Sequence, residues 1–125
     1  MPVTLKPEER DALFEQISAD FGMLGDFEMA IEKGNEEECY RIGRRLLDGL
    51  RLLVDGGLGW RRRTVEPTIL TLPDEEIRRI MNRMRMEALA GMDYTRTDRE
   101  ETQEEWALFP AIKDACDSAL DQTHS

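Results

Sequence analysis

The longest helical pattern in the chain runs from Asn35 to Trp60, where apolar residues recur at intervals of three and four. This spacing is typical of an amphipathic helix that packs one side against a core. The predicted core-facing stripe consists of Cys39, Ile42, Gly43, Leu46, Leu47, Leu50, Leu53 and Val54. Asn35 is a suitable N-cap residue, and Gly56, Gly57 and Gly59 favour termination. We therefore expect a long helix around which the rest of the chain packs.

Two positions in this helix have more than one interpretation. Gly43 interrupts the stripe, either because a second helix approaches closely there or because glycine is tolerated at a cost of about 1 kcal/mol relative to alanine. Leu52 lies away from the stripe, which is compatible with a second contact surface on this helix. The opposite side is charged, with expected ion pairs four residues apart: Glu37–Arg41, Arg44–Asp48 and Arg51–Asp55.

Shorter helical patterns precede this segment. Pro7 favours a helix start, and the apolar face of the first helix is predicted to contain Leu13, Phe14, Ile17, Phe21 and Leu24. Gly22 and Gly25 favour a break or bend, because glycine has low helix propensity. A second short segment with Met29, Ala30 and Ile31 is expected to close at Gly34.

An extended stretch separates the long helix from the last two. Residues 64–72 are bounded by glycines and prolines, and they are compatible with a strand that pairs with Pro2–Leu5 or across a dimer axis. An ordered loop is the favoured alternative, because isolated two-stranded pairs are marginal. The next helix starts at Pro73–Asp74 and ends at Gly91, with a predicted buried stripe of Ile77, Ile80, Met81, Met84 and Ala88.

The last predicted helix opens with a capping-box spacing, in which Thr97 is the N-cap and Glu100 lies three residues later. Pro110 is expected to kink or split it. Its apolar positions are Trp106, Leu108, Phe109, Ile112, Ala115, Cys116, Ala119 and Leu120. The patterns together predict one all-α domain over residues 1–125, an irregular bundle of three longer helices plus shorter segments, with an extended loop or short strand near residues 64–72.

Composition supports a folded, helix-rich protein. The chain is 40% hydrophobic and 35% charged, which separates it from disordered sequences. No apolar run approaches the roughly 20 residues of a membrane span, and residues 1–10 have no signal-peptide pattern, so we expect a cytoplasmic protein without membrane contact. Cys39 and Cys116 lie on apolar stripes and are expected to be buried, reduced thiols.

Charge is distributed unevenly. The net charge is −10, yet residues 41–85 contain eleven arginines, no lysine and six acids, for a net charge of +5, and the remainder carries −15. The favoured interpretation is self-complementarity, in which acidic helices pack beside an arginine-rich hairpin. The overall acidity disfavours nucleic acid as a partner, because nonspecific affinity for phosphate depends on uncompensated positive charge.

The sequence lacks the residues that common active sites require. The single histidine is His124, near the C-terminus, so a Ser-His or Cys-His pair is disfavoured. There is no phosphate-binding loop and no zinc-ligand spacing. The clustered carboxylates Glu36, Glu37, Glu38, Glu100, Glu101, Glu104 and Glu105 are best interpreted as solvated faces. We therefore predict no catalytic, cofactor-binding or metal-binding residues and no cofactor.

One resemblance bears on the fold. The segments GDFEMAIEKGNEEECYRIGRRLLDGLRLLVDGGLGW and LTLPDEEIRRIMNRM, within residues 25–86, resemble small acidic helical proteins of uncharacterised function from actinobacteria. Those proteins have an extended segment between a long helix and a basic helix, and a turn of the DLGW type that reads GGLGW here. The resemblance implies a helical fold and no particular activity.

These observations favour a non-enzymatic interaction module that binds a protein partner or itself, with homo-oligomers as one form. The candidate interaction surface consists of Trp60, Arg61, Arg62, Arg63, Arg78, Arg79, Arg83 and Arg85. The alternative is a nucleic-acid-linked regulatory protein that uses the same arginines, with Trp60 for base stacking. A third hypothesis is a carboxylate-based metal-binding protein or enzyme.

Overall fold

A computed structural model describes residues 2–61, 63–98 and 103–123, with side chains described outside 93–107. The elements, in chain order, are β1 (Val3–Leu5), α1 (Pro7–Phe21), α2 (Leu24–Lys33), α3 (Glu36–Leu50), the π-helical turn η1 (Arg51–Asp55), β2 (Thr68–Leu70), α4 (Asp74–Asp98) and α5 (Gln103–Gln122). The predicted all-α bundle is confirmed, with a two-stranded sheet as its one short extra in the described chain.

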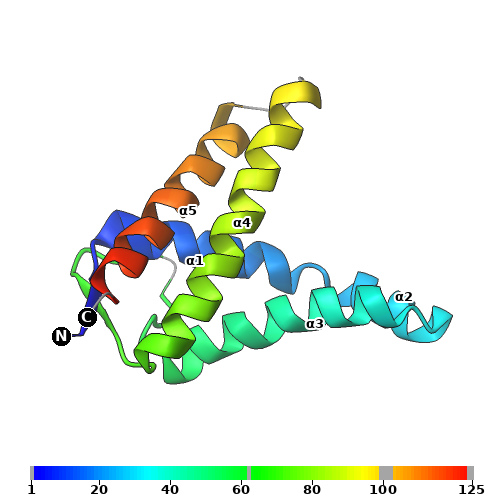
Figure 1. The fold of residues 1–125 in the computed structure, drawn as a ribbon, viewed down its shortest axis with the longest axis horizontal. Helices are drawn as coiled ribbons and strands as arrows, with labels where there is room; N and C mark the ends of the chain where they lie inside the picture. The colour runs from blue at the N-terminus through cyan, green and yellow to red at the C-terminus, as the bar shows by residue number, and fades with distance from the viewer. Residues whose placement is uncertain (1, 62, 99–102, 124–125) are drawn as a thin grey trace.

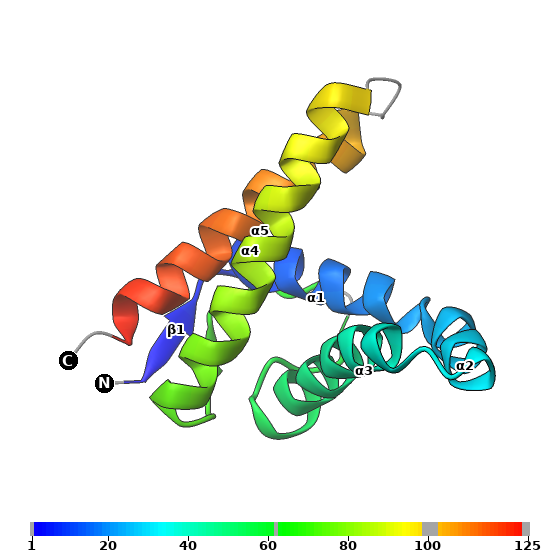
Figure 2. The same ribbon diagram turned by 45° about the vertical axis from the view of Figure 1, so that its right-hand side comes forward.

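The helices form two arms that diverge from a common end. α4 and α5 lie side by side as an antiparallel hairpin, and α3 runs away from the start of α4 toward α2, at the far end from the two termini (Figures 1 and 2). α1 passes between the two arms and packs against both α3 and α5. None of the helices in the described ranges is long and apolar enough to cross a membrane.

The helix ends predicted at Pro7, Gly22, Gly34 and Asn35 are confirmed. The expected break at Gly25 is wrong, because Gly25 lies inside α2, and Leu24 begins α2 instead of belonging to the first helix. Pro7 is the first residue of α1, which ends at Phe21 just before Gly22. α2 closes at Gly34, which adopts a left-handed φ of 69°. Asn35 caps α3, because its side-chain oxygen accepts a hydrogen bond from the Glu38 amide at 3.2 Å. Local capping chemistry therefore sets these boundaries.

Within residues 64–72, for which an ordered loop is the favoured prediction, β2 forms a short strand. β2 pairs with β1 in antiparallel register, Val3 opposite Leu70 and Leu5 opposite Thr68. The pairing survives in so short a sheet because Val3, Leu5 and Leu70 are all buried in the main core. The strand alternative, with Val3–Leu5 as partner, is therefore the correct one.

α4 differs from its prediction at one end. Its buried stripe is as predicted, but the helix continues through Gly91 to Asp98, so the expected end at Gly91 is wrong. A Cβ at Gly91 would lie 2.8 Å from the Phe109 ring of α5, which shows that this glycine serves helix–helix contact. Thr97 still belongs to α4 and is not the N-cap of α5, while residues 99–102, including Glu100, lie outside the described residues. Pro110 lies inside α5 without splitting it.

A buried arginine fixes the loop after η1. Arg10 of α1 is 1% exposed, and it donates to the carbonyls of Leu58 and Gly59 at 3.0 and 2.9 Å. Its guanidinium also lies 4.4 Å from the centre of the Phe14 ring and pairs with Asp11 at 3.0 Å. These bonds satisfy a buried charge and attach the glycine-rich loop to α1.

Candidate functional site

The predicted interaction surface does not gather into one patch on α4. Arg79 and Arg83 point to α3, where both bond Asp48, at 3.1 and 2.7 Å. Arg85 instead pairs with Asp117 of α5 at 2.6 Å, and Arg78 donates to the Thr123 carbonyl at 2.9 Å. The four arginines therefore face two different neighbours.

The other predicted members lie in the loop that follows η1. Trp60, Arg61 and Arg63 are exposed, and Arg62 lies outside the described residues. Neither Arg61 nor Arg63 forms an ion pair within the part of the chain that the structure describes. Among the described residues of the predicted surface, Arg61 and Arg63 of this loop therefore keep their charge uncompensated, and so does Arg78, whose bond is to a backbone carbonyl.

Four of the eleven arginines in residues 41–85 are neutralised in what we term the ion-pair seam between α3–η1 and α4. Arg45 bonds Glu87 at 2.5 Å, and Glu87 also accepts from Arg83. Arg51 makes two bonds to Glu76, at 2.9 and 3.1 Å, and a further one to Asp55. The members of the seam are Arg45, Asp48, Arg51, Asp55, Glu76, Arg79, Arg83 and Glu87.

The buried member of the seam was predicted on the exposed side of the helix. Asp48 is 2% exposed and pairs with α4 rather than with Arg44. The expected pair Glu37–Arg41 is also replaced, because Arg41 bonds Glu38, while Arg51–Asp55 forms as predicted. The arginines of α4 therefore replace the expected Arg44–Asp48 pair, and Arg41 takes a different neighbour within α3. The predicted self-complementarity is met only in part, because Glu87 lies outside residues 41–85, whereas Asp48, Asp55 and Glu76 belong to the arginine-rich segment itself.

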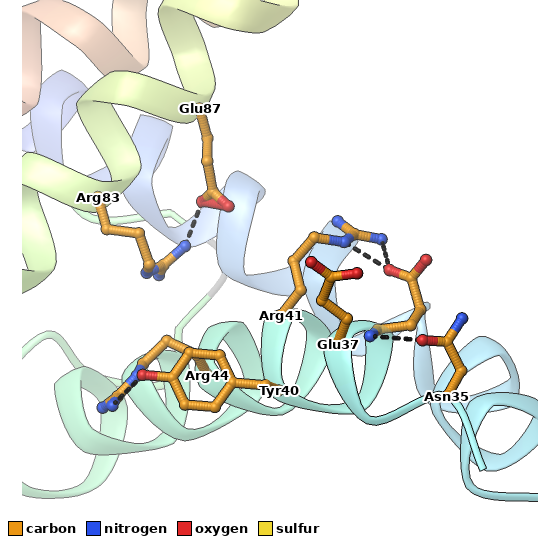
Figure 3. Close-up of a pocket in the computed structure, with 8 residues that line it drawn as sticks. Asn35, Glu37, Tyr40, Arg41, Arg44, Arg83 and Glu87 are labelled. Atoms are coloured by element: carbon orange, nitrogen blue, oxygen red, sulfur yellow. Dashed lines mark hydrogen bonds and ion pairs between the residues drawn. The ribbon is translucent and has the colours of Figure 1, made fainter.

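A cleft of about 500 Å³ opens where α3 and α4 diverge beyond the seam. Figure 3 shows Arg83 and Glu87 of α4 facing Tyr40, Arg41 and Arg44 of α3 across it. Its lining is Asn35, Glu37, Glu38, Tyr40, Arg41, Arg44, Arg83 and Glu87. Three arginines and three glutamates balance in charge, so the lining has no net attraction for an ion of either sign.

One pair in the cleft is polarised. Arg44 Nη2 donates to Tyr40 Oη at 3.1 Å, and the guanidinium lies 5.5 Å from the ring centre. This hydrogen bond and the positive charge of Arg44 lower the pKa of Tyr40 below its ordinary value. Arg44 has no carboxylate partner in the described chain, so the phenol oxygen takes the place of one.

Two titratable groups outside the cleft have a pKa that burial raises. Burial raises the pKa of the Cys116 thiol to about 12, so this buried thiol stays protonated at neutral pH and is unsuited to nucleophilic attack. Burial also raises the pKa of Asp20. In the described ranges no three His, Cys, Asp or Glu side chains are placed to hold a metal ion. The carboxylates at 100–105 lie outside the side chains that the structure describes.

An exposed apolar surface on the α2–α3 hairpin was missed by the sequence prediction. The stripe predicted for the long helix divides in two: Ile42, Leu46 and Leu53 are buried, whereas Leu47, Leu50 and Val54 are exposed. Leu24 and Ile31 of α2 are also exposed. We define the apolar face as Leu24, Ile31, Leu47, Leu50 and Val54, which expose between 42% and 62% of their surface.

Helical geometry places these residues on one side of the hairpin. Met29 of α2 and Arg41 of α3 line a common groove on the side toward the cleft. At about 100° per residue, Ile31 is about half a turn from Met29, and Leu47 is about half a turn from Glu38 in that same groove. The apolar face therefore points away from α4, and Tyr40, which is 69% exposed, lies at the edge between this face and the cleft.

The π-helical turn explains why Leu52 is buried. The Gly56 amide donates to the Arg51 carbonyl at 2.8 Å, a span of five residues that inserts one extra residue into the helical turn. Leu52 and Leu53 consequently both face the core, and Leu52 is fully buried, so this residue forms no second exposed surface. The spacing of 40, 43, 47, 50 and 54, beside the core spacing of 42, 46, 49 and 53, was the sequence signal for two separate faces.

Comparisons with known proteins assign no family: no family model, curated protein or solved structure matches the chain. The resemblance of residues 25–86 to small acidic actinobacterial proteins therefore stays a prediction.

Proposed function

We propose that this protein is a non-enzymatic interaction module that binds another protein through the apolar face of the α2–α3 hairpin. This contact surface differs from the predicted arginine-rich one. The observation that carries the proposal is that α3 and η1 expose Leu47, Leu50 and Val54 at helical spacing, beside residues that are buried in the core. Contiguous apolar surface of this kind on a folded domain is typical of a binding site for another protein.

The arginines contribute to this function by building the scaffold. The ion-pair seam holds α3 against α4. The helix that exposes the apolar face is therefore fixed by contacts on its other side. A preorganised face loses less conformational entropy when a partner binds. The location that fits such a module in this proposal is the cytoplasm.

The test is capture from a lysate of the native host with tagged protein, after nuclease treatment and at moderate salt. A Leu47→Glu, Leu50→Glu double variant should lose the captured protein, because charged side chains cannot be buried in an apolar contact. Val65→Glu is the matched control, because Val65 is 92% exposed in the loop away from the hairpin. Equal capture by all three proteins would refute the proposal.

A second candidate function rests on the loop after η1. Trp60 is 62% exposed next to Arg61 and Arg63, which have no ion-pair partner in the described ranges. This combination of a stacking ring and uncompensated charge supports weak binding of single-stranded nucleic acid. In a fluorescence-anisotropy titration, Arg61→Ala with Arg63→Ala should weaken binding and flatten its salt dependence. Unchanged affinity in that variant would eliminate this candidate.

A further inference from the structure

We infer that the α2–α3 hairpin is a hinged arm, which pivots where α3 meets α1 and is latched against α4 by the ion-pair seam. Release of this latch widens the cleft between α3 and α4. The inference goes beyond the proposed function and does not depend on it, because it concerns the position of the hairpin and not what its apolar face binds. It rests on how the hairpin is attached to the rest of the protein.

The hairpin contributes no residue to the main core. Among the described residues, that core takes its members from β1, α1, η1, β2, α4, α5 and the loops on either side of β2. Ala30, Ile42 and Leu46 of the hairpin are also buried, but they lie outside the main core. Buried apolar contact therefore holds the hairpin together without joining it to the buried stripe of α4.

Both covalent links between the hairpin and the core lie near one end of it. η1 follows Leu50 directly, and Met23, which precedes α2, lies beside Arg45, whose Nη1 donates to the Met23 sulfur at 3.6 Å. Arg45 is six residues before the start of η1, which corresponds to about 9 Å along the helix. Beyond this base, α2 and the first half of α3 extend away from the two chain termini (Figure 1).

The contact between α3 and α1 provides the pivot. A Cβ at Gly49 would lie 2.8 Å from Ile17 Cγ2, so the two helices touch closely at this point. The π-helical turn η1 continues α3 on one side of the contact, and Gly22 separates α1 from α2 on the other. Hinges use such positions at the ends of elements, and π-turns and glycines are common places for a helix to bend.

Charge forms the latch between α3 and α4. Asp48 accepts hydrogen bonds from Arg79 and Arg83 at 3.1 and 2.7 Å, and Arg45 donates to Glu87 at 2.5 Å. The closest backbone neighbours of α3 are instead α2, α1 and the turn η1. An ion pair is lost once its nitrogen and oxygen are more than about 4 Å apart. A separation of a few Å therefore opens the latch and leaves the main core intact.

The cleft lies on the opposite side of the latch from the pivot. Figure 3 shows Arg44 of α3 facing Glu87 of α4 across it. From Gly49 to Glu36, α3 extends over 13 residues, or about 20 Å. A rotation of about 15° at the pivot therefore moves the start of α3 by about 5 Å relative to α4. The hairpin and the main core keep their own packing during this movement.

Pulsed electron paramagnetic resonance between spin labels measures the movement in the full chain. The reporting labels are attached to Lys33→Cys in the hairpin and Asn82→Cys in α4, both of which are exposed positions. The background is Cys39→Ser, and Cys116 stays unlabelled because its side chain is fully buried. Asn82→Cys with Asp114→Cys is the reference pair, since both positions belong to the α4–α5 hairpin.

The test variants remove the latch and keep every apolar side chain. Glu87→Gln should add a component at least about 5 Å longer to the distances between positions 33 and 82. Asp48→Asn combined with Glu87→Gln should increase the share of that component, because it removes the remaining acceptor of Arg83. The reference pair should be unchanged. Asp117→Asn is the matched control, because Asp117 joins Arg85 of α4 to α5, and it should leave both label pairs as in wild type.

The inference fails if a folded double variant, as judged by circular dichroism, keeps the wild-type distances between positions 33 and 82. It also fails if both label pairs broaden equally, because that result indicates general loosening and not rotation of the hairpin. Should the double variant unfold, folded Glu87→Gln decides the question by the same two criteria.

Discussion

α3 and α4 carry apolar stripes that are equally regular in the sequence, and the folded chain treats them differently. In α4 every member of the predicted stripe is at most 3% exposed, because α5 packs along this helix and all of these residues belong to the main core. In α3 the stripe is wider than the core needs, and Leu47 keeps 62% of its surface exposed. Periodicity thus indicates which surface a helix has available to bury. It does not indicate whether the same chain supplies the partner.

The largest expected difference between the two stripes is in the free energy of unfolding that is lost when one large side chain on each helix is truncated. Ile80→Ala removes a fully buried side chain in α4 and should lower the free energy of unfolding by about 2–5 kcal/mol. Leu47→Ala should change it by less than about 0.5 kcal/mol in dilute protein, because the residue is exposed in the monomer. Urea denaturation at low micromolar concentration measures both. Equal losses would show that Leu47 is part of the core after all.

Buried and exposed carboxylates of the ion-pair seam should also differ in how much they contribute to stability. Asp48→Ala should cost about 2–4 kcal/mol, because it removes the acceptor of Arg79 and leaves Arg83, which is largely covered, with Glu87 alone. Asp55→Ala is the control, since its carboxylate is half exposed and pairs with Arg51 at the surface. We expect less than about 1 kcal/mol for the control in the same denaturation experiment. A loss for Asp48→Ala no greater than that of the control would contradict a stabilising seam.

Two glycines of α3 should respond in opposite directions. A Cβ at Gly49 would lie 2.8 Å from Ile17 Cγ2 of α1, so Gly49→Ala should destabilise the fold by about 1–3 kcal/mol. At Gly43 a Cβ would meet the Phe27 ring at 3.4 Å, which is an ordinary contact. Gly43→Ala should therefore stabilise the monomer by up to about 1 kcal/mol through helix propensity. Thermal unfolding of both variants at low concentration distinguishes the two sites.

These contrasts show how far the sequence determined the structure. The start of α1, the cap at Asn35 and the close of α2 at Gly34 were predictable, because each depends on a few neighbouring residues. The continuation of α4 through Gly91 was not, since it depends on Phe109, which is contributed by another helix. Helix propensity and capping residues therefore predict where a helix ends only when no contact with another element outweighs them.

The candidate site was less predictable for a related reason. Arginine content predicts the expected surface, yet Arg79, Arg83 and Arg85 are neutralised by carboxylates that lie on other helices. The buried state of Asp48 and Arg10 likewise depends on groups distant in the sequence. Only the second stripe of α3 and η1, at positions 40, 43, 47, 50 and 54, is visible as a pattern in the sequence, and the pattern alone does not distinguish it from the stripe that faces the core.

The stability contributed by Asp20 and that contributed by Glu76 should depend on pH in opposite directions. Burial raises the pKa of Asp20, so its ionisation opposes folding, and wild type should lose stability relative to Asp20→Asn as the pH rises from about 3.9 through the folded-state pKa. Hydrogen bonds from Arg51 lower the pKa of Glu76, so wild type should lose stability relative to Glu76→Gln as the pH falls from about 4.3 through the folded-state pKa.

Denaturation between pH 3 and 7 measures these two difference curves. As the pH rises, the free energy of unfolding of wild type should fall relative to that of Asp20→Asn. Over the same range it should rise relative to that of Glu76→Gln. Each curve should be flat once the pH exceeds both relevant pKa values. Curves of the same sign would contradict the assignment of burial to one carboxylate and ion pairing to the other.

The smallest effect concerns Tyr40, at the edge between the cleft and the apolar face. The bond from Arg44 stabilises the phenolate, so Arg44→Gln should raise the pKa of Tyr40 toward about 10. Absorbance titration in a Tyr94→Phe background isolates Tyr40, because the chain has two tyrosines. Arg41→Gln is the matched control, since Arg41 is engaged by Glu38 instead. If both variants shift the titration equally, general loss of positive charge rather than the Arg44 hydrogen bond sets the pKa of Tyr40.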